Sequence, residues 1–222
     1  MSIAFFQEEL ENPKKKLQLK INNNRSTMLS VKWEPDCTKV SLHRMFLKAP
    51  QNIMQSLACY IRQEDKNIHP KVKAFIEDGL RKLDYSTCLN QQKLYQTGYV
   101  YNLQKIYDDL NKEYFNNQLD LSITWFGKSR QHNRSRVTFG LYHDPLKLIK
   151  INRMLDSPNF PDYIVSYVVY HEMVHNVCPA YVDEKGISRV HTKEFKEMEA
   201  QYKYFHLADK WIKENQANFF CT

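Results

Sequence analysis

Three short segments near the start of the chain alternate apolar and polar residues. This two-residue period is typical of half-buried strands, in which successive side chains face opposite sides of a sheet. Turn-forming residues separate the segments, with asparagines at 22–24 and Glu-Pro-Asp at 34–36. The pattern predicts a small sheet whose strands are residues 17–21, 27–33 and 38–43.

Helical spacing replaces this alternation after Pro50. Residues 53–61 and 72–83 each carry apolar side chains at the three-to-four spacing of one helical face, so they predict two helices. The segment 84–92 is polar and aperiodic, which favours a boundary there. We therefore expect an N-terminal α+β extension over residues 1–92 and a second domain over residues 93–222.

The second region begins with an amphipathic pattern. Apolar residues recur at three-to-four spacing through Leu103, Ile106 and Leu110, so we expect a helix from Leu94 to Phe115. Strands, a further helix, a loop and a last helical stretch follow, an order typical of an α+β domain. These expected elements are strands at 121–125, 136–142 and 146–151, a helix from Pro161 to Pro179, a loop over 179–189 and a helix over 192–215.

The helix that follows Pro161 contains the sequence HEMVH at residues 171–175. Residues four apart share one helical face, so His171 and His175 can bind one Zn²⁺ ion at about 2.0–2.1 Å. Glu172, rotated by about 100°, is placed to take a proton from water in the open position of the metal and pass it to a leaving amine. We predict one catalytic zinc ion with Glu172 as the general base.

The composition of this helix supports that prediction. Between Pro161 and Pro179 the only carboxylates are Asp162 and Glu172, and lysine and arginine are absent. A carboxylate in the middle of an apolar helix is costly unless it has a partner, which a metal site would supply. The alternative interpretation is that His171 and His175 are ordinary core histidines and that Glu172 pairs with a lysine elsewhere in the chain. This alternative stands because HExxH is short enough to arise by chance.

A third ligand is expected at His191, which follows His175 by 16 residues and opens another helical segment. A surface histidine among basic residues is the alternative interpretation. Some HExxH sites take a carboxylate from the next helix instead. Cys178 is the one candidate that would close the site as a four-ligand structural centre. The competing carboxylates are Asp183, Glu184 and Glu194.

The net charge of the chain suggests a second class of binding partner. The chain has 32 Lys and Arg against 25 Asp and Glu, a net charge of +7 that favours acidic partners such as nucleic acid. A basic stretch follows Trp125 and Phe126, and cations beside aromatic rings suit single-stranded DNA. An ordinary solvated loop is the equal alternative. The candidate nucleic-acid-binding residues are Lys128, Arg130, Arg134 and Arg136.

Cysteine usage and hydropathy bear on location. The five cysteines form no CxxC pair, which favours reduced thiols. The N-terminal residues lack the pattern of a signal peptide, and the most apolar run, 164–169, is far too short to span a bilayer. We expect a cytoplasmic protein without membrane contact.

Several of these segments together resemble SprT-like domains, the family that includes bacterial SprT proteins and the DNA–protein crosslink protease Spartan. The resemblance covers about residues 93–205. It rests on the helix-to-strand segment 107–125, RVTFGLY at 136–142, LIKINRML at 148–155, YVVYHEMVH at 167–175 and VHTKEF at 190–195.

The resemblance implies a zincin-like fold in which His171, His175 and His191 bind zinc and Glu172 is catalytic. It also implies that Phe195 packs beneath the third ligand. Two departures stand out. Thr192 occupies a position where the family usually has glycine, and no CxxC pair of the kind that forms the family's zinc ribbon follows the catalytic segment.

The leading hypothesis is therefore a zinc-dependent metallopeptidase of SprT-like type. Its substrate would be a protein or peptide, with DNA-associated proteins as the candidate class, and the strand RVTFGLY would pair with the extended substrate. The alternative is a basic nucleic-acid-binding module with a structural or inactive zinc site. Three residues are unranked candidates for stabilising the transition state, namely Tyr142, His143 and Tyr181.

Overall fold

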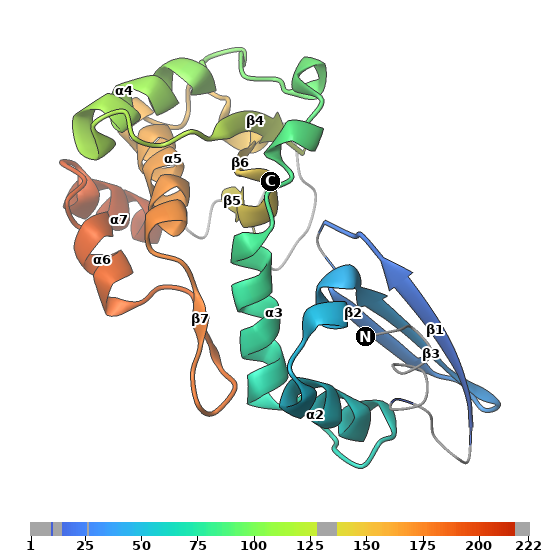
Figure 1. Cartoon of the computed structure of the whole chain (residues 1–222). Helices are drawn as coiled ribbons and strands as arrows, with labels where there is room; N and C mark the ends of the chain where they lie inside the picture. Colours follow the sequence, from blue (N-terminus) through green and yellow to red (C-terminus); the bar gives the residue numbers. More distant parts are fainter. Residues whose placement is uncertain (1–9, 11–14, 26, 128–136, 216–222) are drawn as a thin grey trace. The chain divides into compact units, whose positions relative to one another are not determined.

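The computed structural model describes residues 10, 15–25, 27–127 and 137–215 of the chain (Figure 1). It divides into two compact units. Unit 1 comprises Met1–Leu83 and Ala180–Val190, and unit 2 comprises Asp84–Pro179 and His191–Thr222. This division differs from the predicted one by residues 84–92 and, more importantly, by the late segment Ala180–Val190, which belongs with the N-terminal residues.

Unit 1 is built on a three-stranded sheet, as the alternating pattern predicted. Strands β1 (Lys16–Asn22) and β2 (Leu29–Trp33) flank β3 (Cys37–His43), which runs parallel to β1 and antiparallel to β2. The register aligns apolar residues across one face, where Leu19, Val40 and Val31 are neighbours.

Two helices complete the core of unit 1. The predicted helices are confirmed as α2 (Gln51–Ile61) and α3 (Pro70–Lys82). Leu57 and Ile61 of α2 and Val72 of α3 are almost fully buried together with sheet residues. The segment 179–189, expected to be a loop, instead contains a small antiparallel hairpin of β7 (Tyr181–Val182) and β8 (Ser188–Arg189).

Unit 2 has the expected α+β composition. Its sheet has the order β4-β6-β5, with β4 (Ser122–Phe126) parallel and β5 (Gly140–His143) antiparallel to the central β6 (Leu148–Asn152). Helix α5 (Asp162–Val177) contacts both this sheet and α4 (Leu103–Phe115). The remaining helices are α6 (Lys193–Glu199) and α7 (Phe205–Asn215).

The first helix of this unit begins at Leu103, so the prediction of a start at Leu94 was wrong. Asn102 caps it by accepting a hydrogen bond from the Lys105 N–H at 3.1 Å. The preceding residues are held in another conformation by Asp156, whose carboxylate accepts three backbone N–H bonds. These come from Tyr99, Val100 and Tyr101 at 2.5, 2.8 and 3.1 Å.

Two further boundaries were also wrong. The strand predicted over 136–142 begins only at Gly140. The residues before Gly140 are held differently, because the side-chain amide of Asn152 donates a hydrogen bond to the Thr138 carbonyl at 2.9 Å. The helix predicted over 192–215 is divided into α6 and α7. The break brings Tyr202 into the core, where its ring stacks on Tyr170 at a centroid distance of 5.4 Å.

No helix in the described part of the chain combines the length and the apolar character that crossing a bilayer requires.

Candidate metal centre

Helix α5 is the central element of unit 2. Its apolar residues face several directions, and Val165, Val169 and Met173 are fully buried against α4 and the sheet. Such a helix is held by packing on most of its surface, so its side chains have little freedom to move. The HEMVH sequence occupies its last turns. Its two histidines are partly buried and Glu172 is only 5% exposed.

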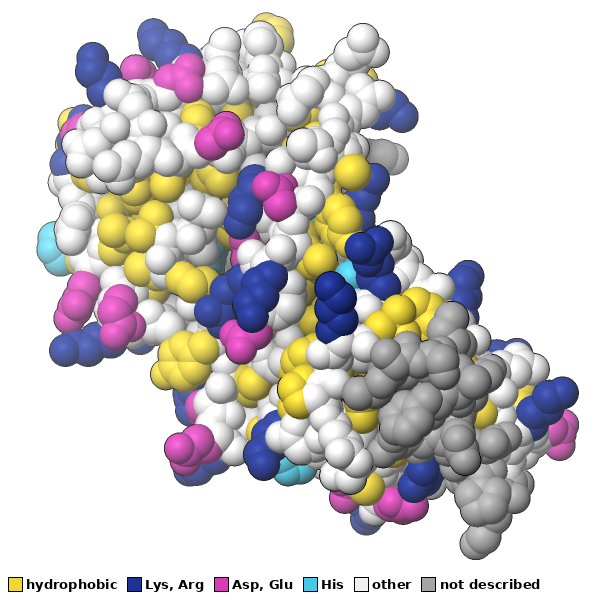
Figure 2. Space-filling view, viewed as in Figure 1, with side chains coloured by type: hydrophobic (Ala, Val, Ile, Leu, Met, Phe, Trp, Pro, Cys, Tyr) yellow, Lys and Arg dark blue, Asp and Glu magenta, His cyan; other side chains and the backbone are white. Residues whose placement is uncertain are grey.

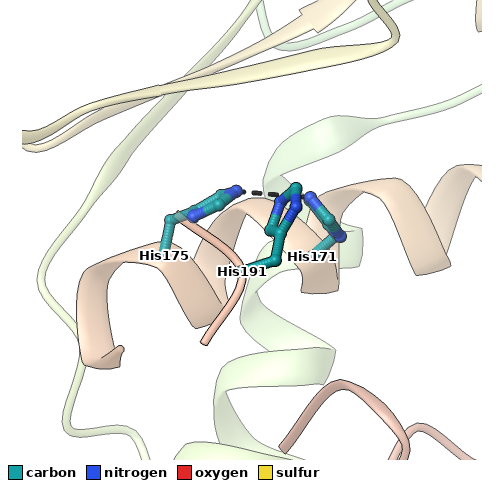
Figure 3. Close-up of side chains that lie close together, drawn as sticks. All are labelled: His171, His175 and His191. Carbon is teal, nitrogen blue, oxygen red and sulfur yellow. Dashed lines mark hydrogen bonds between the residues drawn. The ribbon is translucent and has the colours of Figure 1, made fainter. Parts of the chain in front are cut away.

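Three histidines converge at one point of unit 2 (Figure 3). His171 and His175 project from α5, and His191 comes from the segment just before α6. One nitrogen from each ring lies within 4.8 Å of the others. The ring centroids are 4.9 to 5.2 Å apart. The residues predicted to be ligands are therefore brought together by the fold.

The spacing of these nitrogens fits a zinc ion. Two ligand atoms bound to a tetrahedral zinc at about 2.0–2.1 Å lie about 3.3 Å from each other. The Nε2 atoms of His171 and His175 are 3.2 Å apart. Three imidazoles at this spacing can hold one metal ion and leave a fourth position for water or substrate.

The ring of Phe195 packs against the rings of all three histidines. It is fully buried and lies 5.0, 4.6 and 4.7 Å from the centroids of His171, His175 and His191. Thr192 starts the helix that carries Phe195, since its hydroxyl accepts the Phe195 N–H at 3.2 Å. Thr192 has φ −69°, which a non-glycine residue adopts without strain.

Glu199 is a residue of this centre that the sequence analysis missed. Its Oε1 atom lies 2.6 Å from Nδ1 of His171 and accepts a hydrogen bond from the Tyr167 hydroxyl at 2.7 Å. A carboxylate can only accept, so Nδ1 carries the proton and Nε2 of His171 is free to bind a metal. Burial opposes ionisation of Glu199, but the hydrogen bonds from His171 and Tyr167 outweigh it and lower its pKa.

A signal for Glu199 was present in the sequence. Glu199 follows Phe195 by four residues, so both side chains project from the same face of α6 toward His171. Recognising it required knowing that α6 packs against α5, and the contact between these helices is tertiary.

Glu172 directly follows His171 on α5, and the two residues line the same cavity. Burial raises the pKa of the Glu172 carboxyl to about 7, against the opposing effects of His171 and of a hydrogen bond from the backbone N–H of Tyr142. Strand β5 passes very close to it. A Cβ atom added to Gly140 would lie 2.4 Å from Oε1 of Glu172. Glycine at this position therefore makes the approach of the strand to the carboxylate feasible.

A cavity of about 290 Å³ opens beside Glu172 and His171. Its walls come from α5, from α7 and from the strand region around β5, and they are mostly apolar. The lining residues are Phe139, Gly140, Tyr167, Val168, His171, Glu172 and Ile212.

The competing ligands occupy other environments. The three-histidine group includes no carboxylate among the described residues. Glu194 interacts with the N-terminus of α6, where hydrogen bonds from its own backbone N–H and from Thr192 lower its pKa. Asp183 accepts hydrogen bonds within the β7–β8 hairpin, and Glu184 is exposed there. The thiol of Cys178 faces the Met198 sulfur at 4.0 Å.

The other candidate residues are placed as follows. The Tyr142 hydroxyl is engaged structurally, since it accepts from Asn176 at 2.7 Å and donates to Asp144 at 3.1 Å. His143 is partly buried at the end of β5, and Tyr181 belongs to the hairpin of unit 1. The predicted nucleic-acid-binding residues Lys128, Arg130, Arg134 and Arg136 lie outside the described residues.

Comparison with known proteins adds one finding. Residues 103–216, which contain the whole three-histidine centre, Glu172 and Glu199, match the SprT-like family. No curated protein and no solved structure matches the chain.

Proposed function

We propose, because the chain belongs to the SprT-like family, that it is a zinc-dependent metallopeptidase with a zincin-like catalytic domain. The observation that carries the proposal is the convergence of three imidazoles beside a buried carboxyl whose pKa is about 7. Family membership by itself suggests the type of domain. The arrangement of these side chains suggests the reaction.

His171, His175 and His191 would hold the metal, with Phe195 as their apolar support and Glu199 fixing the ring of His171. A bound zinc ion would supply a Lewis acid that activates water near neutral pH. Glu172 then acts as the general base. A carboxyl with a pKa of about 7 can accept a proton from water and return it to the leaving amine at the pH of the cell.

Strand β5 is the proposed substrate-binding edge. Within the described residues it pairs only with β6, which leaves its other side open for an extended peptide. Backbone pairing of this kind selects an extended conformation more than a sequence. The apolar cavity beside Glu172 would then accept a substrate side chain next to the bond that is cleaved.

A basic nucleic-acid-binding module with a structural or inactive zinc site is the second candidate. Structural zinc sites normally have four protein ligands, whereas the group seen in the described residues has three. Lys and Arg side chains are distributed over the face shown in Figure 2 with acidic ones among them. The net charge of +7 therefore supports DNA-associated substrates only in general terms.

The central experiment combines zinc analysis with protease assays on the wild type and Glu172→Gln, with and without single-stranded DNA. We expect about one zinc per chain in both proteins and a loss of roughly 10²–10⁴-fold in activity in the variant. Full activity of Glu172→Gln would reject Glu172 as the base. Zinc without activity under any condition would favour the binding module.

A second experiment tests the third ligand. His191→Ala should lose zinc on dilution, because two imidazoles bind the metal far more weakly than three. His206→Ala, which removes an exposed histidine from α7, is the matched control and should retain the metal. An unchanged zinc content in His191→Ala would reject His191 as the third ligand.

A further inference from the structure

The chain that connects the two HEMVH histidines to the third one passes through the other compact unit. Helix α5 ends at Val177, and α6 begins at Lys193. Between them, Ala180–Val190 belongs with Met1–Leu83, and His191 is the first residue to return to unit 2. His191 is thus joined to α5 through a segment that folds as part of unit 1.

This hairpin is well ordered within itself. Asp183 accepts hydrogen bonds from the N–H groups of Lys185 and Ile187 at 3.0 and 2.8 Å. Its other carboxylate oxygen receives the Arg189 guanidinium at 2.8 and 2.9 Å. Gly186 adopts φ +75° in the turn, a conformation that favours glycine. These contacts link the two strands and the turn of the hairpin. Binding the hairpin at two of its residues therefore restrains the whole segment.

Helix α3 binds the hairpin at two points. Arg81, near the end of the helix, donates to the carbonyl of Ala180 at 2.9 Å, where the hairpin begins. Lys73, in the first turns, donates to the carbonyl of Gly186 at 3.0 Å, in the hairpin turn. At the same end a Cβ added to Gly186 would lie 3.0 Å from the Pro70 ring. The hairpin thus runs along α3, as Figure 1 shows for β7.

We propose that Lys73 and Arg81 are positioning residues of the metal centre, because they hold the hairpin that delivers His191. The hairpin has only two residues in each strand, so without the anchors its strands would separate more often, and closing the longer open segment on the metal would cost entropy. With the hairpin bound to α3 at its start and at its turn, Tyr181 and Arg189 stay paired, so the two ends of the segment are held together and much of that cost is met before the metal binds. The inference rests on the proposed zinc site and assigns the N-terminal unit a role in its affinity.

The test compares two double variants of the full chain on the same helix. Lys73→Ala/Arg81→Ala removes both anchors. Lys71→Ala/Lys82→Ala removes the same charge from two exposed positions of α3 and is the control. Zinc affinity is measured by competition with a chromophoric chelator. We expect the anchor variant to bind zinc about tenfold more weakly, the size of effect expected from two hydrogen bonds, and the control to match the wild type.

A double-mutant cycle with His191→Ala separates positioning from a general loss of stability. If the anchors act through His191, removing them in the His191→Ala background should leave zinc affinity unchanged. An equal loss in both backgrounds would overturn the proposal. Amide hydrogen exchange of the metal-free chain gives a second readout, in which the anchor variant should exchange faster over residues 180–192.

The outcomes distinguish this inference from the proposed function. A wild type that binds no zinc would reject both. A wild type that binds zinc, together with an anchor variant of the same affinity or unchanged hydrogen exchange, would reject the positioning role alone.

Discussion

Glu172 and Glu199 show how two carboxyl groups near one centre acquire opposite properties. Glu172 is almost fully buried, and burial raises its pKa to about 7. Glu199 is also partly buried, but two hydrogen bonds favour its ionised form and lower its pKa. The first is therefore suited to exchange a proton, and the second is suited to remain an anion that orients His171.

The raised pKa of Glu172 predicts how the metal-free protein responds to pH. The carboxyl ionises near 4.5 in the unfolded chain and near 7 in the folded one. The folded state thus binds more protons between these values, so its stability falls as pH rises from about 4.5 to 7, by at most about 3 kcal/mol. Urea unfolding of chelator-treated wild type and Glu172→Gln at pH 5 and pH 8 measures this. Parallel pH dependence in the two proteins would contradict it.

Glu199→Gln tests the orienting carboxylate. The amide oxygen can still accept from His171 but lacks the charge, so we expect zinc affinity to fall about 10–100-fold with the fold intact. Chelator competition measures the affinity. Glu197→Gln, an exposed position of the same helix, is the control and should bind zinc as the wild type does. Equal affinities in the two variants would remove Glu199 from the centre.

At the scale of elements, the closeness of β5 to α5 is the contact on which the proposed chemistry depends. The strand supplies a backbone N–H to Glu172 from Tyr142, and it approaches closely because residue 140 has no side chain. The strand therefore positions the proposed base and also presents the open sheet edge. A change in its distance from the helix would alter both.

Gly140→Ala tests this contact. The added Cβ would lie 2.4 Å from Oε1 of Glu172, so the strand or the carboxylate must move. We expect peptidase activity to fall about 100-fold, the cost of a displacement of about 1 Å at a reacting group. Zinc content should be unchanged, because none of the three histidines is displaced. Wild-type activity in this variant would show that the β5–Glu172 distance is not critical.

For the whole molecule, three ligands from two separate segments link metal binding to folding. The metal would bind the folded chain and not the unfolded one, which lacks the site. At a free zinc concentration 100 times Kd, this adds about 2.7 kcal/mol to the free energy of unfolding. Chelation should therefore lower the unfolding temperature of the wild type in calorimetry, and His171→Ala/His175→Ala should not respond. The same shift in both proteins would place the metal elsewhere.

The sequence by itself determined the elements whose cause is local. Strands β1 to β3, helices α2 and α3 and the pairing of His171 with His175 follow from periods of two and of 3.6 residues, which depend only on backbone geometry. The role predicted for Glu172 likewise followed from the apolar residues around it in the same helix. The family was also recognisable from these segments.

Only the tertiary structure decided the rest, because the deciding partners are distant in sequence. Asp156 prevents residues 99–101 from joining α4, although Asp156 lies more than 50 positions after them in the sequence. Glu199 reaches His171 across 28 positions. Lys73 binds the Gly186 carbonyl across 113 positions, which assigns the hairpin before His191 to the N-terminal unit. Local propensity carries no information about such contacts, since they exist only after the elements have packed.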